Sequence, residues 1–310
     1  MAETLLFHSD YDDAAAWTDA LKRELPDLDI AVSTRPYDPA AVRYALVWQP
    51  PVGFFAPLVN LALVTNLGAG VDALVGRADL PGVPVTRICD PEMARMMASF
   101  VLLAVLRHAR DIPLLEQARR ERRWHWVNPR AAGEISVGIL GLGELGARAA
   151  REVAGQGFRV KGWSRSPKTL TGIETSYGLG ALDGFLSGVE ILVVMLPLTA
   201  ETRHLLDARR LALLPRGAKL VNVARGAVVD EAALVEALRG GDLDSATLDV
   251  FEVEPLPQDS PLWAMENVLI TPHLASVAIP SSAAAQIAEN IRRLRRGAAP
   301  LFKVEAGRGY

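Results

Sequence analysis

The sequence is short of several features that mark particular classes of protein. Its single cysteine, Cys89, cannot form an internal disulfide or a cysteine zinc cluster, so a reducing cytoplasm is the expected setting. Lysine plus arginine number 33 and aspartate plus glutamate 36, and a formal net charge of -3 lacks the broad positive field of a nucleic-acid-binding protein. No apolar run approaches the roughly 18 residues of a membrane helix. The first residues, Met-Ala-Glu-Thr, do not resemble a signal peptide. We therefore expect a soluble protein with neither nucleic acid nor membrane as a partner.

What is present is typical of a globular protein with a large core. Hydrophobic residues make up 50% of the chain and charged residues 22%. At about 150 residues per domain, 310 residues favour two domains.

The first part of the chain alternates short apolar runs with polar or helical stretches. The runs at residues 4–8, 30–33, 44–48 and 61–65 predict the strands of a small parallel sheet. Asp90, Pro91 and Glu92 then supply a helix cap, a first-position proline and a first-turn acid. About thirty residues of helical character follow, ending in the Arg- and Trp-rich residues 119–126, and this helix is expected to connect the domains.

From residue 135 the alternation of strands and helices restarts. Helices are expected after Gly143, at residues 230–239, and from Ser281 or Ser282 to about Arg296. The last of these helices comes after the second sheet is complete, so it can return to the first domain. Short apolar, β-branched runs predict strands covered on both faces, at residues 135–140, 158–163, 190–196, 219–223, 245–249 and 268–270.

A glycine-rich loop follows the first strand of this second set. Gly141, Gly143 and Gly146 fit the pattern G-x-G-x-x-G between a strand and a helix. The first glycine permits a tight turn, the second lets the backbone approach a pyrophosphate, and the third allows close packing of helix on strand. The phosphates of a dinucleotide would lie at the helix N-terminus, where free amides favour anions. The alternative is an ordinary glycine turn.

The end of the next strand lacks the acid that usually binds the adenosine ribose. Residues 164–168 read Ser-Arg-Ser-Pro-Lys instead. A carboxylate would repel a 2′-phosphate, whereas Ser164, Ser166 and the guanidinium of Arg165 can bind one. NADP(H) is therefore favoured over NAD(H), unless Arg165 and Lys168 merely solvate a loop.

Three polar residues stand at or just after predicted strand ends in the second sheet: Arg225, Glu254 and His273. Ligands of open parallel sheets bind outside the carboxyl ends of the strands, so these side chains are expected to face one cleft. Reduction of a 2-oxo acid needs a cation for the carboxylate and an acid that protonates the carbonyl oxygen. Arginine suits the first task and histidine the second, and a neighbouring carboxylate such as Glu254 would favour the protonated imidazole.

With these motifs in order, the chain resembles the D-isomer-specific 2-hydroxyacid dehydrogenases, and among them is similar to the glyoxylate/hydroxypyruvate reductase A branch. The similarity extends from about residue 45 to 290. It is carried by residues 67–72 (LGAGVD), 141–146 (GLGELG), 163–166 (WSRS), 222–226 (NVARG), 248–251 (LDVF), 254–256 (EPL) and 271–273 (TPH).

The resemblance implies an α/β protein with a Rossmann-type doubly wound parallel sheet and a second, smaller flavodoxin-like α/β domain. The dinucleotide-binding domain would span residues 99–278, and the substrate-binding domain residues 1–98 and 279–310. It implies reduction of glyoxylate or hydroxypyruvate to the D-2-hydroxy acid in the cleft between the domains, with NADPH preferred and NADH possible. It also implies a homodimer built on the long connector helix and on the arm at its end that contains Trp124 and Trp126.

The same resemblance assigns roles to individual residues. Arg225 would grip the substrate carboxylate and carbonyl, His273 would be the catalytic acid with Glu254 as its partner, and Asp249 would bind the nicotinamide carboxamide. The substrate carboxylate would also meet backbone amides at Gly68, Ala69 and Gly70, with Trp48 at the pocket edge. The remaining cofactor contacts would come from Gly141, Gly143, Glu144, Leu145, Gly146, Ser164, Arg165, Ser166, Leu196, Pro197 and Val223.

Several alternatives stay open at this point. Trp48 also suits a core position, and Trp124 and Trp126 suit an interface, where the resemblance allows one of them to reach a partner's active site. Glu201 and Asp207 are interpreted as capping or solvated charges, and no histidine spacing indicates a metal site. The substrate could be a bulkier 2-oxo acid of the phenylpyruvate kind. The fold also serves non-catalytic, nucleotide-sensing corepressors, against which the combination of Arg225, Glu254 and His273 argues.

Overall fold

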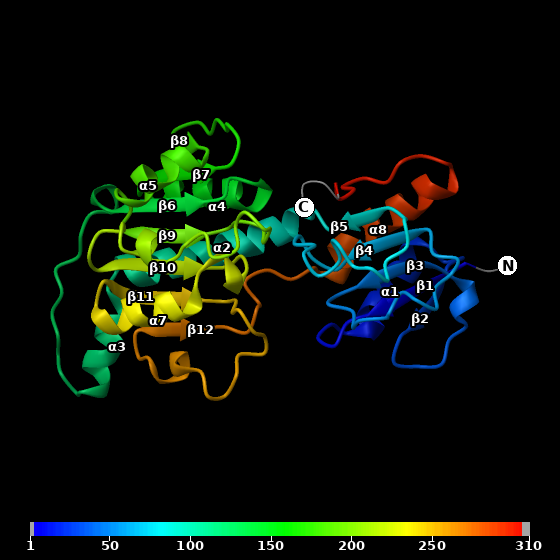
Figure 1. Ribbon diagram of the computed structural model, residues 1–310, viewed down its shortest axis with the longest axis horizontal. Helices are drawn as coiled ribbons and strands as arrows, with labels where there is room; N and C mark the ends of the chain where they lie inside the picture. Colours follow the sequence, from blue (N-terminus) through cyan, green and yellow to red (C-terminus); the bar gives the residue numbers. More distant parts are fainter. Residues whose placement is uncertain (1–2, 306–310) are drawn as a thin grey trace. The chain divides into compact units, whose positions relative to one another are not determined.

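The computed structural model describes residues 3–305, and the chain divides into two compact units. Unit 1 comprises Met1–Met93 and Val277–Tyr310, and unit 2 comprises Ala94–Ser276 (Figure 1). The smaller unit is thus assembled from both ends of the chain. Its boundaries lie at Met93 and Val277, compared with 98 and 279 in the sequence-based prediction.

Unit 1 contains a five-stranded parallel sheet in the order β2-β1-β3-β4-β5, which is the flavodoxin-like order. The strands are β1 (Thr4–His8), β2 (Asp29–Val32), β3 (Val42–Val47), β4 (Leu63–Asn66) and β5 (Val85–Arg87). Four of them coincide with predicted runs to within two residues. β5 was missed because its three residues, Val-Thr-Arg, include a single apolar side chain and give no apolar run.

Two helices from opposite ends of the chain pack on this sheet. α1 (Ala14–Glu24) begins after Asp13, whose carboxylate caps two of its first amides, and α8 (Pro280–Arg295) begins with a proline. Their buried faces join one core with the strands, which includes Trp17, Leu21 and Ile287. A short 3-10 turn, η1 (Pro39–Ala41), precedes β3.

The predicted connector of about thirty residues is two helices, α2 (Pro91–Ala109) and α3 (Ile112–Arg120). α2 begins at Pro91 as expected, and the Asp90 carboxylate accepts a hydrogen bond from the amide of Glu92. The break comes at Asp111, which has a φ of 51° and precedes Ile112-Pro113 at the start of α3. A left-handed residue cannot continue a helix, and proline donates no amide hydrogen bond, so the sequence around Asp111 separates the two helices.

Unit 2 contains a seven-stranded parallel sheet in the order β12-β11-β10-β9-β6-β7-β8. This is the Rossmann order with one further strand. The strands are β6 (Ser136–Leu140), β7 (Arg159–Ser164), β8 (Glu174–Tyr177), β9 (Ile191–Val194), β10 (Ala218–Asn222), β11 (Leu243–Leu248) and β12 (Val268–Ile270). The strand β8 was not predicted, because its sequence, Glu-Thr-Ser-Tyr, is polar and lies at the sheet edge.

Helices cover both faces of this sheet and create two separate cores. One core buries α2 and α4 with strands β6, β7 and β9, and the other buries α5, α6 and α7 with strands β9, β10 and β11. The helical segments between strands are α4 (Glu144–Gly155), α5 (Leu179–Leu186), α6 (Ala208–Leu211) and α7 (Glu231–Gly240), with 3-10 turns η2 (Ala132–Glu134), η3 (Gly226–Val228) and η4 (Pro261–Ala264). The doubly wound α/β fold class predicted from the sequence is confirmed. No helix within residues 3–305 is long and apolar enough to span a membrane.

The strand order places two sets of loops where a ligand of a parallel sheet would bind. The carboxyl ends of β10, β11 and β12 are neighbours, and these are the strand ends that precede Arg225, Glu254 and His273. The strand β6 lies between β7 and β9, so the loop that follows it is flanked by the loops that follow those two strands.

A buried histidine joins α2 to the sheet of unit 2. The ring nitrogens of His108 lie 3.1 Å from the Ser245 hydroxyl and 3.0 Å from the Thr247 hydroxyl, both on β11. Burial, together with the positive charges of Arg107 and Lys219, lowers the pKa of His108 to about 3. The folded protein therefore keeps this imidazole neutral.

His108 should make the protein less stable as the pH falls. Below the ordinary histidine pKa of 6.5 the unfolded chain binds a proton that the folded chain does not bind until about pH 3. Between pH 7.5 and 5.5 the free energy of unfolding should fall by about 1 kcal/mol more in the wild type than in His108→Gln, which keeps hydrogen-bonding groups but does not titrate. Urea denaturation at both pH values measures this difference, and equal losses would contradict the assignment.

Candidate active site

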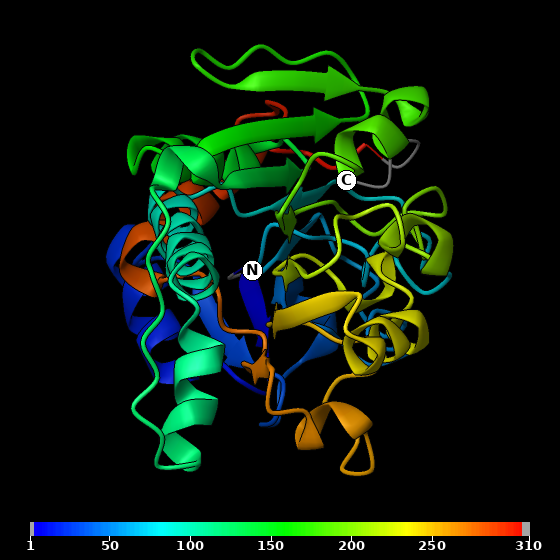
Figure 2. The ribbon, with the colours of Figure 1, turned by 90° about the vertical axis from the view of Figure 1, so that its left-hand side faces the viewer.

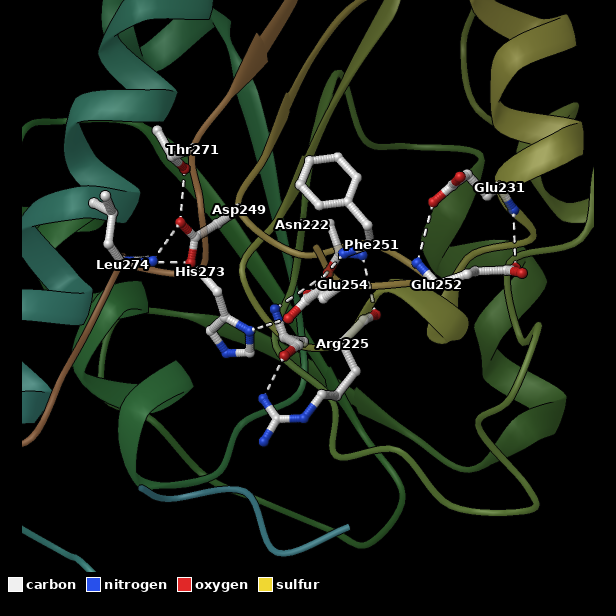
Figure 3. Close-up of polar contacts among 12 residues, drawn as sticks. Asn222, Arg225, Glu231, Asp249, Phe251, Glu252, Glu254, Thr271, His273 and Leu274 are labelled. Carbon is white, nitrogen blue, oxygen red and sulfur yellow. Dashed lines mark hydrogen bonds and ion pairs between the residues drawn. The ribbon is translucent and has the colours of Figure 1, made fainter. Parts of the chain in front are cut away.

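The three predicted catalytic residues lie together at the carboxyl ends of neighbouring strands (Figure 3). The Nδ1 atom of His273 is 2.7 Å from Oε2 of Glu254, and each side chain is 23% exposed. Arg225 follows β10, close enough for its positive charge to lower the pKa of Glu254. An arginine, a histidine and a carboxylate thus share one end of the sheet.

The charge on Glu254 decides which nitrogen of His273 carries a proton. Burial opposes ionisation of Glu254, but the hydrogen bond and charge of His273, the Phe251 amide and Arg225 outweigh it, so that the pKa of Glu254 is lowered. The ionised carboxylate can only accept hydrogen bonds, so Nδ1 of His273 must be the donor. This leaves Nε2 as the nitrogen that can exchange a proton with a substrate.

Asp249 holds the segment that carries His273. Its carboxylate is buried and accepts hydrogen bonds from the Thr271 hydroxyl at 2.6 Å and from the amides of Leu274 and Ala275 at 2.9 Å each. The amide of His273 itself donates to the Asp249 carbonyl at 2.8 Å. Burial raises the pKa of Asp249, and these donated hydrogen bonds offset only part of that rise. The carboxylate predicted to face the nicotinamide is thus engaged with the loop after β12, and its contact with a cofactor remains a prediction.

The backbone of His273 needs this support. Its φ is 54°, in the left-handed region that non-glycine residues seldom adopt. Such a conformation persists only where surrounding contacts fix it, and it is frequent at functional sites. The contacts with Asp249 on both sides of His273 supply that constraint.

Asn222, which sequence reasoning did not single out, fixes the turn that carries Arg225. It is the last residue of β10 and is buried; its Nδ2 donates to the Arg225 carbonyl at 3.1 Å and its Oδ1 accepts from the Ala224 amide at 3.1 Å. Arg225 Nη1 donates to the Ala224 carbonyl at 2.7 Å. An asparagine at the end of an apolar strand, just before a loop with a candidate site residue, is the sequence signal that could have identified Asn222.

Gly226 lets two of the site loops meet. A Cβ atom on Gly226 would lie 1.8 Å from the carbonyl carbon of Phe251 and 2.3 Å from the amide nitrogen of Glu252. No residue larger than glycine fits at this position, because its side chain would collide with the backbone atoms of Phe251 and Glu252, which cannot rotate away. The turn of Arg225 is therefore packed directly on the loop that leads to Glu254.

The glycine loop after β6 has the geometry expected of a pyrophosphate cradle. Gly141 has a φ of 116°, and a Cβ on Gly146 would lie 1.9 Å from the Gly141 carbonyl oxygen. Gly146 thus packs mainly on the turn, rather than on the strand as predicted. A Cβ on Gly143 would meet nothing within 4 Å, and α4 begins at Glu144 without a side-chain cap. Leu145, the next residue, faces the core.

The loops on either side of this cradle hold the other residues expected to contact a cofactor. Ser164 ends β7, is buried, and donates its hydroxyl to the Ser166 carbonyl at 2.7 Å, while Arg165 and Ser166 are exposed. On the opposite side Leu196 is buried after β9, and the Pro197 carbonyl accepts from the Thr202 hydroxyl at 2.7 Å. Val223 is buried in the core.

The predicted substrate loop of unit 1 is held by a second strand-end asparagine. Asn66 ends β4 and is buried, and its Nδ2 donates to the carbonyls of Gly68 at 3.2 Å and Gly70 at 2.7 Å. The half-buried Trp48 lies against Gly68, where a Cβ would be 2.7 Å from its ring, and Ala69 packs on the core beside it. Trp48 and the loop are thus neighbours within unit 1. Their contact with a substrate remains a prediction.

The described part of the chain has no cluster of side chains suited to bind a metal ion. Among residues 3–305 there is no group of three or more His, Cys, Asp or Glu side chains arranged to hold an ion.

The family model "D-isomer specific 2-hydroxyacid dehydrogenase, NAD binding domain" matches residues 102–275, more than half of the chain. The chain belongs to this family. The resemblance drawn from the sequence motifs is therefore confirmed.

Individual members of the D-isomer-specific 2-hydroxyacid dehydrogenase family match along the whole chain. A glyoxylate/hydroxypyruvate reductase A from Serratia proteamaculans is 38% identical over 99% of both sequences. A D-isomer-specific 2-hydroxyacid dehydrogenase from Xanthobacter autotrophicus Py2, solved with NADPH and MES, is 62% identical with a TM-score of 0.95 over 100% of both chains. An NADPH-dependent glyoxylate/hydroxypyruvate reductase from Sinorhizobium meliloti, solved with NADP and sulfate, is 32% identical with a TM-score of 0.93, covering 99% of this chain and 100% of the other.

Proposed function

We propose that this protein catalyses the NADPH-dependent reduction of glyoxylate or hydroxypyruvate, or both, to the D-2-hydroxy acid. The observation that carries this proposal is the His273–Glu254 hydrogen bond of 2.7 Å beside Arg225, in a chain of this family. The Serratia and Sinorhizobium relatives, which bear the name of this activity, support the choice of substrate. A non-catalytic nucleotide sensor would not need an oriented proton donor next to an arginine.

Each catalytic side chain has a task that its geometry suits. The Arg225 guanidinium binds the substrate carboxylate and polarises the adjoining carbonyl group. His273, oriented through Nδ1 by Glu254, gives the proton on Nε2 to the carbonyl oxygen as negative charge develops there. A nicotinamide, when bound, supplies the hydride that reduces the carbonyl carbon.

The residues around the glycine loop fit a phosphorylated dinucleotide. Gly143 leaves open space at the start of α4 and, as the N-cap residue, has no side chain to cap the helix, which suits a pyrophosphate. The strand β7 ends at Ser164 and is followed by Arg165, so this strand end does not carry the aspartate or glutamate that would bind an unphosphorylated ribose and repel a 2′-phosphate. NADPH is therefore the preferred cofactor, in agreement with the Xanthobacter relative solved with NADPH. NADH remains possible at lower affinity.

Replacing the proton donor tests the catalytic assignment. His273→Ala should lower kcat by about 10²- to 10⁴-fold with glyoxylate or hydroxypyruvate, because general acid catalysis is lost, while NADPH still binds. Loss of NADPH absorbance measures turnover, and nicotinamide fluorescence measures binding.

A matched control is His204→Ala. His204 also pairs with a glutamate, Glu252, at 2.8 Å, but it is not assigned to catalysis, and its loss should leave turnover near that of the wild type. Near-normal turnover in His273→Ala would refute the proton-donor role.

Arg165 tests the cofactor assignment. Arg165→Asp should lower kcat/KM for NADPH at least tenfold and leave kcat/KM for NADH equal or higher, because a carboxylate repels the 2′-phosphate. Arg159→Asp makes the same charge change on an exposed residue at the other end of β7 and should alter neither value. Unchanged kinetics with both cofactors in Arg165→Asp would remove Arg165 from the site.

The apolar surface of α2 and α3 supports the homodimer predicted from the resemblance. Leu103 is 59% exposed and lines an apolar groove of about 570 Å³. The other residues that line it are Leu106, Arg107, Arg110, Ile112, Leu115 and Leu269. An exposed apolar face of this kind usually binds another protein surface.

An irregular arm, residues 121–131, follows α3 and runs back beside it (Figure 2). Trp124 and Trp126 are 96% and 75% exposed, and they lie in an irregular segment rather than at the end of a helix as predicted. The helix ends at Arg120 because Arg122 adopts a φ of 56° and the Arg123 amide donates back to the Ala118 carbonyl. Whether either tryptophan reaches the active site of a second copy stays a prediction.

The dimer has a direct test. Light scattering of the wild type should give twice the chain mass of 33.4 kDa. Leu103→Asp should shift the mass toward that of a single chain, because it places a charge on the apolar face, whereas Val52→Asp, on an exposed residue of unit 1, should not. A wild-type mass of one chain would contradict the proposal.

The cytoplasmic location predicted from the single cysteine stays a prediction that cell fractionation can check.

A further inference from the structure

The loop after β9 brings a carboxylate to the predicted 2′-phosphate site. Oε2 of Glu201 lies 3.5 Å from Nη1 of Arg165, and the two side chains are 69% and 50% exposed. Glu201 was interpreted from the sequence as a capping or solvated charge, but its carboxylate is paired with the arginine assigned to the cofactor. Asp207, interpreted in the same way, does cap a helix, since it accepts from the Arg210 amide at 2.8 Å.

The position of this ion pair follows from the strand order. Arg165 follows β7 and Glu201 lies in the loop after β9, and these strands lie on either side of β6. The pair therefore connects the two loops that flank the glycine loop expected to hold the pyrophosphate.

Both partners stand on turns that are closed by side-chain hydrogen bonds. The Ser164 hydroxyl donates to the Ser166 carbonyl at 2.7 Å and closes the turn that carries Arg165. The Thr202 hydroxyl accepts from the Thr199 amide at 2.8 Å and donates to the Pro197 carbonyl at 2.7 Å, which closes the turn that carries Glu201. These hydrogen bonds fix the two backbone turns from which the guanidinium and the carboxylate extend toward each other.

We infer that Glu201 is a specificity-determining residue that weakens the binding of the 2′-phosphate. A 2′-phosphate on Arg165 must compete with the Glu201 carboxylate for the same guanidinium, and it also lies close to a like charge. NADH has a hydroxyl group in place of the 2′-phosphate, so Arg165 strengthens its binding less and Glu201 weakens its binding less. Glu201 therefore narrows the difference in affinity between NADPH and NADH. This inference rests on the proposed function, in which Arg165 binds the 2′-phosphate.

The test measures binding of cofactor fragments, without turnover. Calorimetry with 2′,5′-ADP and with 5′-AMP gives the ratio of their affinities, which reports the contribution of the 2′-phosphate. In Glu201→Gln this ratio should rise about two- to fivefold, the range for removing an exposed charged partner, with 5′-AMP affinity unchanged. Glu174→Gln, which removes an exposed carboxylate paired with Lys161 on β7, should leave the ratio unchanged.

A double-variant comparison shows whether Glu201 acts through Arg165. In an Arg165→Gln background, Glu201→Gln should raise the ratio by less than it does in the wild-type background, because the shared guanidinium is gone. An unchanged or lower ratio in Glu201→Gln, or an equal rise in both backgrounds, would overturn the inference.

The wild-type ratio separates this inference from the proposed function. If 2′,5′-ADP binds the wild type no more tightly than 5′-AMP, the assignment of NADPH fails, and the role of Glu201 fails with it. If 2′,5′-ADP binds more tightly and Glu201→Gln leaves the ratio unchanged, only the role of Glu201 fails.

Discussion

The sheet end of unit 2 that carries the proposed catalytic residues depends on the buried carboxylate of Asp249. It accepts hydrogen bonds from Thr271, Leu274 and Ala275, and it thereby fixes the segment after β12 against the end of β11. Because His273 lies inside that segment with a φ of 54°, its orientation toward Glu254 is maintained by contacts that the ring itself does not make. A carboxylate that was predicted to bind a cofactor is thus a structural support of the proposed proton donor.

Buried polar groups hold the loops at the strand ends that carry proposed site residues. Asn222 ends β10 and holds the turn of Arg225, and Asn66 ends β4 and holds the loop at Gly68. A buried amide is costly unless its hydrogen bonds are satisfied, so each asparagine stabilises one loop conformation over others. Gly226 adds a steric constraint, because only glycine allows the Arg225 turn to lie on the backbone of Phe251.

Much of the fold could be predicted from the sequence because buried parallel strands are continuous apolar runs. The runs at β1, β6, β9 and β12 are apolar enough to be predicted as strands, whereas β5 and β8 are too polar to be recognised. The break between α2 and α3 was missed because the helical composition continues across Asp111, and only its backbone conformation interrupts the helix. The family was evident from several motifs in a fixed order, which local composition alone cannot produce.

The sequence by itself determined the fold class, the family, the glycine loop, and the candidate arginine, glutamate and histidine, since each depends on residue types at short spacings. The family resemblance already implied the pairing of Glu254 with His273, whereas only the tertiary structure decided that Asp249 meets the loop after β12 and that Glu201 meets Arg165. These pairs are separated along the chain and are brought together by the order of strands in a parallel sheet. Spacing in the sequence does not specify that order, because it results from how helices pack on both faces of the sheet.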